Sequence, residues 1–203
     1  MYLLKSHRIS CIFMLTEYYF NLLNWKVMIR MNVFDAIQKR REITKFLNKK
    51  ISKETLEQIL DAGYLSPAGN NLPSREFILV QTPEILQHLA KATPFVPWLE
   101  GSQVAIVILG RPDISKYWLQ DASIASGFIW LSATELGLGA AFGAIYHVED
   151  AEESAKRENY VRESLAIPQD RRVVAILGLG YPEILPPAKT QLPRETIVHY
   201  NQF

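Results

Sequence analysis

Residues 119–144 read LQDASIASGFIWLSATELGLGAAFGA and contain the two patterns from which the fold is inferred. The first part is rich in alanine, serine and glycine at helical spacing, which predicts one long helix over 118–136. The glycine-bearing run that follows predicts a strand over 139–145. A helix that leads directly into a strand indicates a fold in which the two kinds of element alternate.

The same alternation continues outward in both directions. Short apolar runs predict three further strands, at 76–81 (EFILVQ), 104–109 (VAIVIL) and 172–179 (RVVAILGL). Helical patterns follow the N-cap candidates Asn32 and Ser52, a third opens with Pro83, and a charged one covers 149–165. The alternation predicts an α/β or α+β sandwich in which helices pack against a sheet.

Composition limits the class of protein. The chain has 203 residues, of which 48% are hydrophobic, and a net charge of +1. This length suits one domain, the apolar content excludes disorder as the main state, and the near-neutral charge argues against a nucleic-acid binder driven by bulk charge. The single cysteine, Cys11, cannot form an internal disulfide, and no Cys/His cluster has metal-ligand spacing. We therefore expect a reducing, cytoplasmic setting and no metal.

Residues 1–30 differ from the rest, because they hold four basic side chains against Glu17 alone. The aromatic-rich stretch 9–25 could be a signal peptide or a membrane anchor. It is shorter than the roughly 20 apolar residues of a span, contains Glu17 in its middle and lacks a small-residue cleavage site. We therefore interpret it as a translated leader before a start at Met28 or Met31, and expect the domain to occupy 31–203. A membrane contact is expected only if this extension acts as an anchor.

Three stretches could carry chemistry, and each also has a plainer structural explanation. The run 39–41 (KRR) could bind a phosphate or simply end a helix. The run 66–71 (SPAGNN) could bring backbone and amide groups to a flat ligand or form an ordinary loop. The run 137–144 (GLGAAFGA) lacks the third glycine of the dinucleotide fingerprint, which rejects a Rossmann site, but its backbone could still reach a ligand.

The tail over 181–203 contains four prolines and little helical periodicity, yet it ends in apolar residues. These side chains could be buried against a neighbouring subunit, or the tail could be disordered. The residues alone leave both alternatives open.

Taken together and in order, five segments resemble the nitroreductase family of FMN-dependent oxidoreductases. The resemblance covers essentially all of 32–203. It implies an α+β fold, a nitroreductase-like α/β sandwich with a central, mostly antiparallel sheet of four or five strands flanked by helices. It also implies an intertwined homodimer with a domain-swapped C-terminal tail and FMN at the subunit interface. The segments are KRREITKF (39–46), LSPAGNNLPSREFILV (65–80), LQDASIASGFIWLSATELGLGAAFGA (119–144), VVAILGLGYP (173–182) and KTQLPRETIVHY (189–200).

The resemblance also implies where the cofactor is bound. Basic residues near both ends of the domain would approach the phosphate, the loop over 66–71 would line the isoalloxazine ring, and Gly143 and Ala144 would offer backbone N–H groups to the ring. No catalytic side chain is implied, because the flavin carries the redox chemistry. The residues expected at the cofactor are Arg40, Arg41, Thr44, Pro67, Asn71, Gly143, Ala144, Lys189 and Arg194.

The chain departs from the family pattern around the phosphate. Glu42 stands where a serine is frequent, Thr44 where a basic residue is frequent, and Gln191 and Leu192 where an arginine pair is common. These changes remove positive charge and add a carboxylate next to a dianionic phosphate, and each lost charge-assisted contact is worth roughly 1.5–3 kcal/mol. Glu42 could instead orient Arg41 or bind a ribityl hydroxyl.

The function implied by the resemblance is that of an FMN-dependent oxidoreductase. It would use NADH or NADPH in a ping-pong hydride transfer to an electron-poor acceptor such as a nitroaromatic or a quinone. A flavin-binding or storage dimer with little or no turnover is the alternative, motivated by the missing basic residues. The expected partners are a second copy of the chain and a small-molecule acceptor, with no nucleic acid. Four aromatic residues are candidates for the substrate wall, although core or dimer contacts explain each more simply: Phe95, Trp98, Tyr117 and Trp118.

Overall fold

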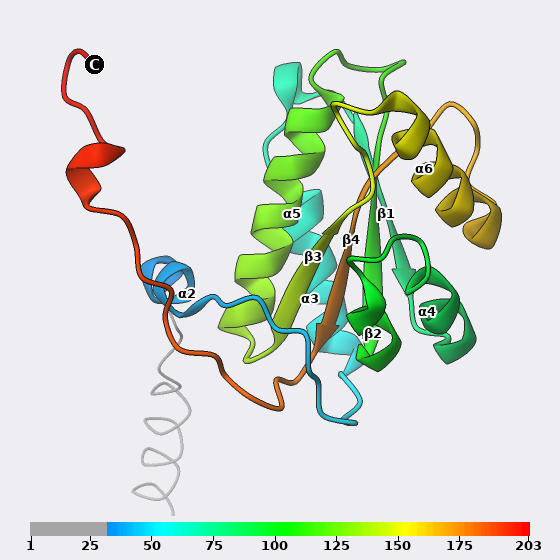
Figure 1. Cartoon of the computed structure of the whole chain (residues 1–203), viewed down its shortest axis with the longest axis horizontal. Coiled ribbons are helices and arrows are strands. Elements are labelled where there is room, and N and C mark those ends of the chain that lie inside the picture. Colours follow the sequence, from blue (N-terminus) through cyan, green and yellow to red (C-terminus); the bar gives the residue numbers. More distant parts are fainter. Residues whose placement is uncertain (1–31) are drawn as a thin grey trace, which may run out of the picture. The chain divides into compact units, whose positions relative to one another are not determined.

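A computed structural model of the chain describes residues 32–203, so the expectations for residues 1–30 (the anchor, the leader and the later start) lie outside the described residues. The described part contains a four-stranded sheet with the strand order β1-β2-β4-β3 (Figure 1). All three strand pairings are antiparallel, which confirms the α+β interpretation. The strands are β1 (Arg75–Val80), β2 (Val104–Gly110), β3 (Gly139–Ala144) and β4 (Arg172–Gly180).

The central strand β2 explains why the sheet is covered on both faces. All seven of its residues are buried, and its apolar run shows no alternation with polar residues, as expected for a strand without a solvent face. Successive side chains point to opposite faces, so Ile106 and Ile108 belong to one apolar cluster while Val107 and Leu109 belong to the other. The sheet is therefore the middle layer of a sandwich.

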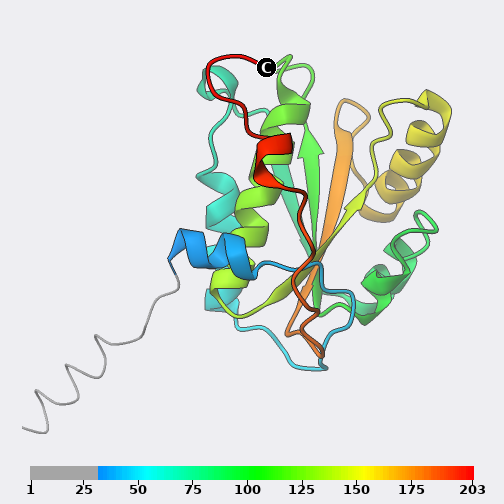
Figure 2. The same ribbon diagram turned by 60° about the vertical axis from the view of Figure 1, so that its left-hand side comes forward.

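The five described helices lie on the two sides of the sheet, with α2 packed on α5. The first apolar cluster includes residues of α3 and α5, and the second includes residues of α4 and α6. Figure 2 shows α2 and the chain's last segment on the α5 side, with α4 and α6 on the other side. Within residues 32–203, no helix has the length and apolar character needed to cross a membrane. The helices are α2 (Val33–Lys39), α3 (Lys53–Tyr64), α4 (Pro83–Leu89), α5 (Trp118–Glu135) and α6 (Ala151–Leu165).

Local signals set most of the helix boundaries. The Ser52 hydroxyl accepts a hydrogen bond from the backbone N–H of Thr55 at 3.1 Å, which confirms the predicted N-cap of α3. The pattern after Asn32 predicts a helix over 33–41 (VFDAIQKRR), but helix α2 ends two residues earlier, at Lys39. The chain turns there because the next residues run along β3, where the Ile43 N–H donates to the Ala140 carbonyl at 3.0 Å. A sheet contact formed by distant residues thus ends the helix.

The segment after β4 is extended, as its prolines predict. The Glu183 N–H still donates to the Lys45 carbonyl at 3.1 Å, and beyond it the chain leaves the sheet and runs past α2 to the C-terminus (Figure 1). Its only regular element is the short 3-10 turn η3 (Arg194–Thr196), and its apolar side chains Leu192, Ile197 and Tyr200 are exposed.

Helix α6 is attached to β4 by a buried carboxylate. Glu158 accepts hydrogen bonds from the guanidinium of Arg172 at 2.6 and 2.9 Å, from the Val173 N–H at 2.9 Å and from the Ser154 hydroxyl at 2.9 Å. Burial raises the pKa of Glu158, but the bonds from Arg172, Val173 and Ser154 outweigh it and hold the net pKa below its ordinary value. The ionised carboxylate therefore stabilises the packing of α6.

We expect Glu158→Gln to lower the free energy of unfolding by about 2 kcal/mol at neutral pH, because the amide cannot accept this set of bonds. Since the pKa of Glu158 is lower in the folded state, its contribution is present above the ordinary value of 4.5 and is lost as the pH falls through the folded value. Urea unfolding across this pH range measures both effects.

The matched control is Glu153→Gln on the same helix, which removes a more exposed ion pair with Arg157. Its effect should stay within about 0.5 kcal/mol. Equal effects of the two substitutions would contradict the role assigned to Glu158.

Candidate functional site

A cavity of about 520 Å³ brings together residues from both ends of the described chain. Arg40 and Lys189, which both belong to the predicted set, line it, and so does Glu42. The charged groups lie beside an apolar wall contributed by α2 and α5. The lining consists of Ile37, Arg40, Glu42, Gly127, Trp130, Leu131 and Lys189.

Arg40 is supported by a stack of aromatic rings. Its guanidinium carbon lies 4.5 Å from the ring centroid of Trp130, a cation–π geometry. The Trp130 ring is parallel to that of Phe142, with centroids 6.5 Å apart, and its Nε1–H donates to the Arg41 carbonyl at 3.3 Å. The sequence analysis missed Trp130. The signal that could have identified it is a tryptophan in the second half of the long predicted helix.

The other residues predicted for the charged end of the ligand do not line this cavity. The Arg41 guanidinium folds back and donates to the carbonyls of Gln38 and Arg40, both at 2.8 Å. Within residues 32–203, its Nε is the only buried side-chain polar atom without a hydrogen-bond partner. Arg194 donates to the Tyr200 hydroxyl at 2.7 Å, and Thr44 lies exposed in the segment after Arg41.

The predicted ring-binding loop forms a tight turn. Asn70 and Asn71 adopt left-handed backbone conformations, with φ values of 54° and 55°, which asparagine tolerates better than most residues. The Asn71 N–H donates to the Ala68 carbonyl at 3.0 Å, and Pro67 is exposed in the same loop. Asn71 lines a separate cavity of about 430 Å³, together with Tyr64, Leu65, Ser66, Leu72, Pro73, Arg75 and Phe77.

Asp121, in the first turn of α5, holds this loop in place. Its side chain is buried, with 3% of the residue exposed. One carboxylate oxygen accepts from the Gly69 N–H at 2.8 Å and the other from the hydroxyl of Ser74, which is also buried. Sequence analysis missed Asp121 as well, although a single acid within an otherwise apolar helix start is an identifiable signal.

Gly143 and Ala144 lie at the end of β3, where they are opposite Ile176 and Ala175 of β4. Gly143 is buried, and a Cβ there would lie 2.4 Å from Cγ1 of Val96, so only glycine fits. Ala144 is exposed. Five of the predicted residues thus occupy three places on one chain: Arg40 and Lys189 at one cavity, Asn71 at a second, and Gly143 and Ala144 at the end of β3. The other four (Arg41, Thr44, Pro67 and Arg194) line neither cavity.

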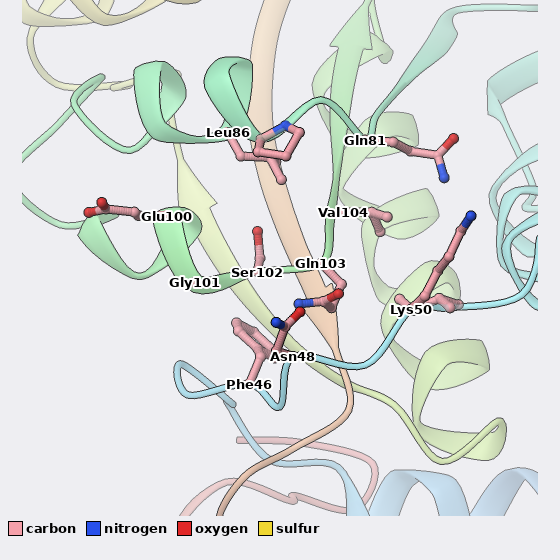
Figure 3. A pocket seen from close by; sticks show the side chains of 12 residues that line it. Phe46, Asn48, Lys50, Gln81, Leu86, Glu100, Gly101, Ser102, Gln103 and Val104 are labelled. Carbon is pink, nitrogen blue, oxygen red and sulfur yellow. The ribbon is translucent and has the colours of Figure 1, made fainter.

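A larger cavity lies elsewhere in the described part of the chain. It has a volume of about 740 Å³ and contains none of the predicted residues (Figure 3). Three of its lining side chains are amides (Asn48, Gln81 and Gln103), and Lys50 and Glu100 point away from each other (Figure 3). No group of three or more His, Cys, Asp or Glu side chains within 32–203 could hold a metal ion. The predicted site offers two cations, Arg40 and Lys189, an aromatic wall at Trp130, and the loop that contains Asn71. These groups suit an anionic ligand with a flat ring.

Comparison with known proteins gives a consistent result. The profile of the nitroreductase family matches residues 37–96. The chain is 35% identical over 151 residues to the "Putative NADH dehydrogenase/NAD(P)H nitroreductase" of Archaeoglobus fulgidus. The aligned residues make up 72% of this chain and 83% of the relative. It is 32% identical over 156 residues to the protein of the same name from Methanothermobacter thermautotrophicus, with 75% and 78% covered.

Solved structures share the fold. The FMN-dependent nitroreductase of Clostridium difficile R20291 has a TM-score of 0.76 and 32% identity, with 83% of this chain and 98% of that chain covered. The NADPH:FMN oxidoreductase of Vibrio harveyi, complexed with NAD+, has a TM-score of 0.72 at 22% identity, with 84% and 77% covered. At that identity the likeness concerns the fold alone.

The contacts of Asp121 lead to a prediction about the loop. Asp121→Asn should lower the free energy of unfolding by about 2 kcal/mol, because an amide has a single acceptor oxygen and places a donor against Gly69 or Ser74. Amide hydrogen exchange at Gly69 should accelerate more than exchange in β2. Glu135→Gln, at the exposed end of the same helix, is the control and should change neither quantity. Unchanged exchange at Gly69 in Asp121→Asn would refute the anchoring role.

Proposed function

This chain belongs to the nitroreductase family, and from that membership we propose that it is an NAD(P)H-dependent flavin oxidoreductase that uses FMN. The observation that carries the proposal is the convergence of Arg40 and Lys189 on one cavity. Hydrogen bonds from Arg or Lys to a phosphate are charge-assisted and about twice as strong as neutral ones. The residues present therefore fit the charged end of FMN.

The chain's own groups suit the remaining parts of the cofactor. The Trp130 ring gives the cavity an aromatic wall, and the Asn71 amide can both donate to and accept from the polar edge of a ring. Ala144 is exposed at the end of β3, where a ligand could contact it. The chemistry that FMN supplies when bound is hydride transfer, from NADH or NADPH in one half of a ping-pong cycle and to a nitroaromatic or quinone in the other.

We also propose that two copies of the chain form each site. The cavity at Arg40 and Lys189 shares no lining residue with the cavity at Asn71, so one chain presents the two halves of the site in separate places. In the proposed homodimer, each FMN contacts Arg40 and Lys189 of one chain and the Asn71 loop of the other.

Exposed apolar side chains support this assembly. They occur on α2 and α5 and along the tail, which extends away from the sheet and would lie over the partner (Figure 1). Burying such surface favours association by about 25 cal/mol per Å². The residues concerned are Val33, Phe34 and Ile37 of α2, Ile124 and Phe128 of α5, and Leu192, Ile197, Tyr200 and Phe203 of the tail.

The test of the proposal is the visible spectrum of the purified full-length protein. We expect bound flavin absorbance, loss of that absorbance when NADH or NADPH is added without oxygen, and its return on addition of a quinone or a nitroaromatic. Protein that binds no flavin after incubation with FMN would refute the proposal. Bound flavin that neither nucleotide reduces would favour the flavin-binding or storage alternative.

A matched pair of variants tests the cavity itself. Lys189→Gln should weaken FMN binding by about 10- to 100-fold, since it removes one charge-assisted contact. Lys91→Gln, an exposed lysine that does not line the cavity, should leave the affinity unchanged.

A further inference from the structure

The cavity at Arg40 and Lys189 also contains a carboxylate, and this determines which flavins it can hold. Glu42 lines the cavity together with the two cations. Within residues 32–203 its carboxylate forms no hydrogen bond or ion pair, so neither Arg40 nor Lys189 neutralises it by direct contact. The charged groups around the cavity therefore sum to one net positive charge.

The backbone fixes Glu42 in this position. Glu42 forms an isolated parallel bridge with Ala140 of β3, and the next residue, Ile43, is 3% exposed. A Cβ at Gly139 would lie 2.6 Å from the side chain of Ile43, so the segment is pressed against the sheet at this point. The backbone therefore holds Glu42 beside the cavity, which its side chain lines.

Two other basic residues predicted for the phosphate are directed elsewhere. Arg41 is hydrogen-bonded to the end of its own helix, and Arg194 is hydrogen-bonded to Tyr200. Neither lines the cavity. A phosphate monoester carries a charge of about −1.5 to −2 at pH 7, so it meets two cations and one opposing carboxylate here.

We propose that Glu42 is a specificity-determining residue of the flavin site, an inference that rests on the function proposed above. Its carboxylate offsets one of the two cations, which leaves the net attraction of one cation for the phosphate. One charge-assisted contact corresponds to about 10- to 100-fold in affinity. The chain thus binds FMN only about 10- to 100-fold more tightly than riboflavin. It can therefore bind riboflavin, the flavin without a phosphate, in place of FMN.

The Glu42 carboxylate favours binding of the ribityl chain, which FMN and riboflavin share. The ribityl chain, which links the ring to the phosphate, carries hydroxyl groups that can donate to Glu42. Hydrogen bonds from a hydroxyl to an ionised carboxylate are about twice as strong as neutral ones. Glu42 therefore weakens the contact with the phosphate and strengthens the contact with the polyol.

The experiment titrates flavin-free, full-length protein into FMN and, separately, into riboflavin, and follows the quenching of flavin fluorescence. Low ionic strength is used because it screens the charges least. The wild type is compared with Glu42→Gln and with the control Glu84→Gln, which removes the same charge from α4 on the other face of the sheet. Circular dichroism checks that each variant is folded.

We expect wild type and Glu84→Gln to bind both flavins, with FMN preferred by about 10- to 100-fold. Glu42→Gln should raise that preference by at least about 10-fold, through tighter FMN binding and weaker riboflavin binding. A wild-type preference above about 1,000-fold, or a ratio unchanged in Glu42→Gln, would overturn the inference and leave the proposed function intact. Failure of the wild type to bind either flavin would overturn the proposed function itself.

Discussion

The central strands β2 and β4 must be covered on both faces, and the rest of the structure follows from this requirement. All of β2 and nearly all of β4 is buried, so helices occupy both sides of the sheet. No ligand can enter the middle layer. The groups proposed to bind a ligand lie at the rim, on the α5 side, where α2, the Asn71 loop and the tail approach one long helix.

Helix α5 links the parts of the site because it contacts each of them. Asp121, in the first turn of α5, accepts hydrogen bonds from Gly69 and Ser74 and so holds the Asn71 loop. Trp130, further along the same helix, stacks against the guanidinium of Arg40. The small residues predicted along this helix allow close packing: Ala122, Ala125 and Ala133 are fully buried against the sheet or its neighbours. The site thus consists of loops and chain ends on a rigid scaffold, open on the side where a second copy would bind. In the proposed function, the balance of charge at the cavity, with Glu42 beside Arg40 and Lys189, sets how strongly it holds a phosphate.

Local sequence patterns predicted the fold well. The unbroken apolar run of β2, the cap at Ser52 and the proline at the start of α4 are properties of neighbouring residues, and the structure has them where expected. The candidate site was predicted through the family resemblance rather than from the residues. Trp130 and Asp121 were missed because their roles depend on groups far away in the sequence, Arg40 for one and Gly69 with Ser74 for the other. The orientation of Arg41 could not be predicted either, since it depends on where pairing with β3 ends the helix.

The central claim is that one flavin site uses residues of two chains, and a mixed dimer tests it most directly. Lys189→Gln and Asn71→Ala are co-expressed with different tags, and the heterodimer is isolated. If the site is shared as proposed, both substitutions fall in one of its two sites, and the other site binds FMN with wild-type affinity. Each homodimer should then bind FMN weakly at both sites. A heterodimer in which both sites are weakened, or a protein that is monomeric when FMN is bound, would contradict the account.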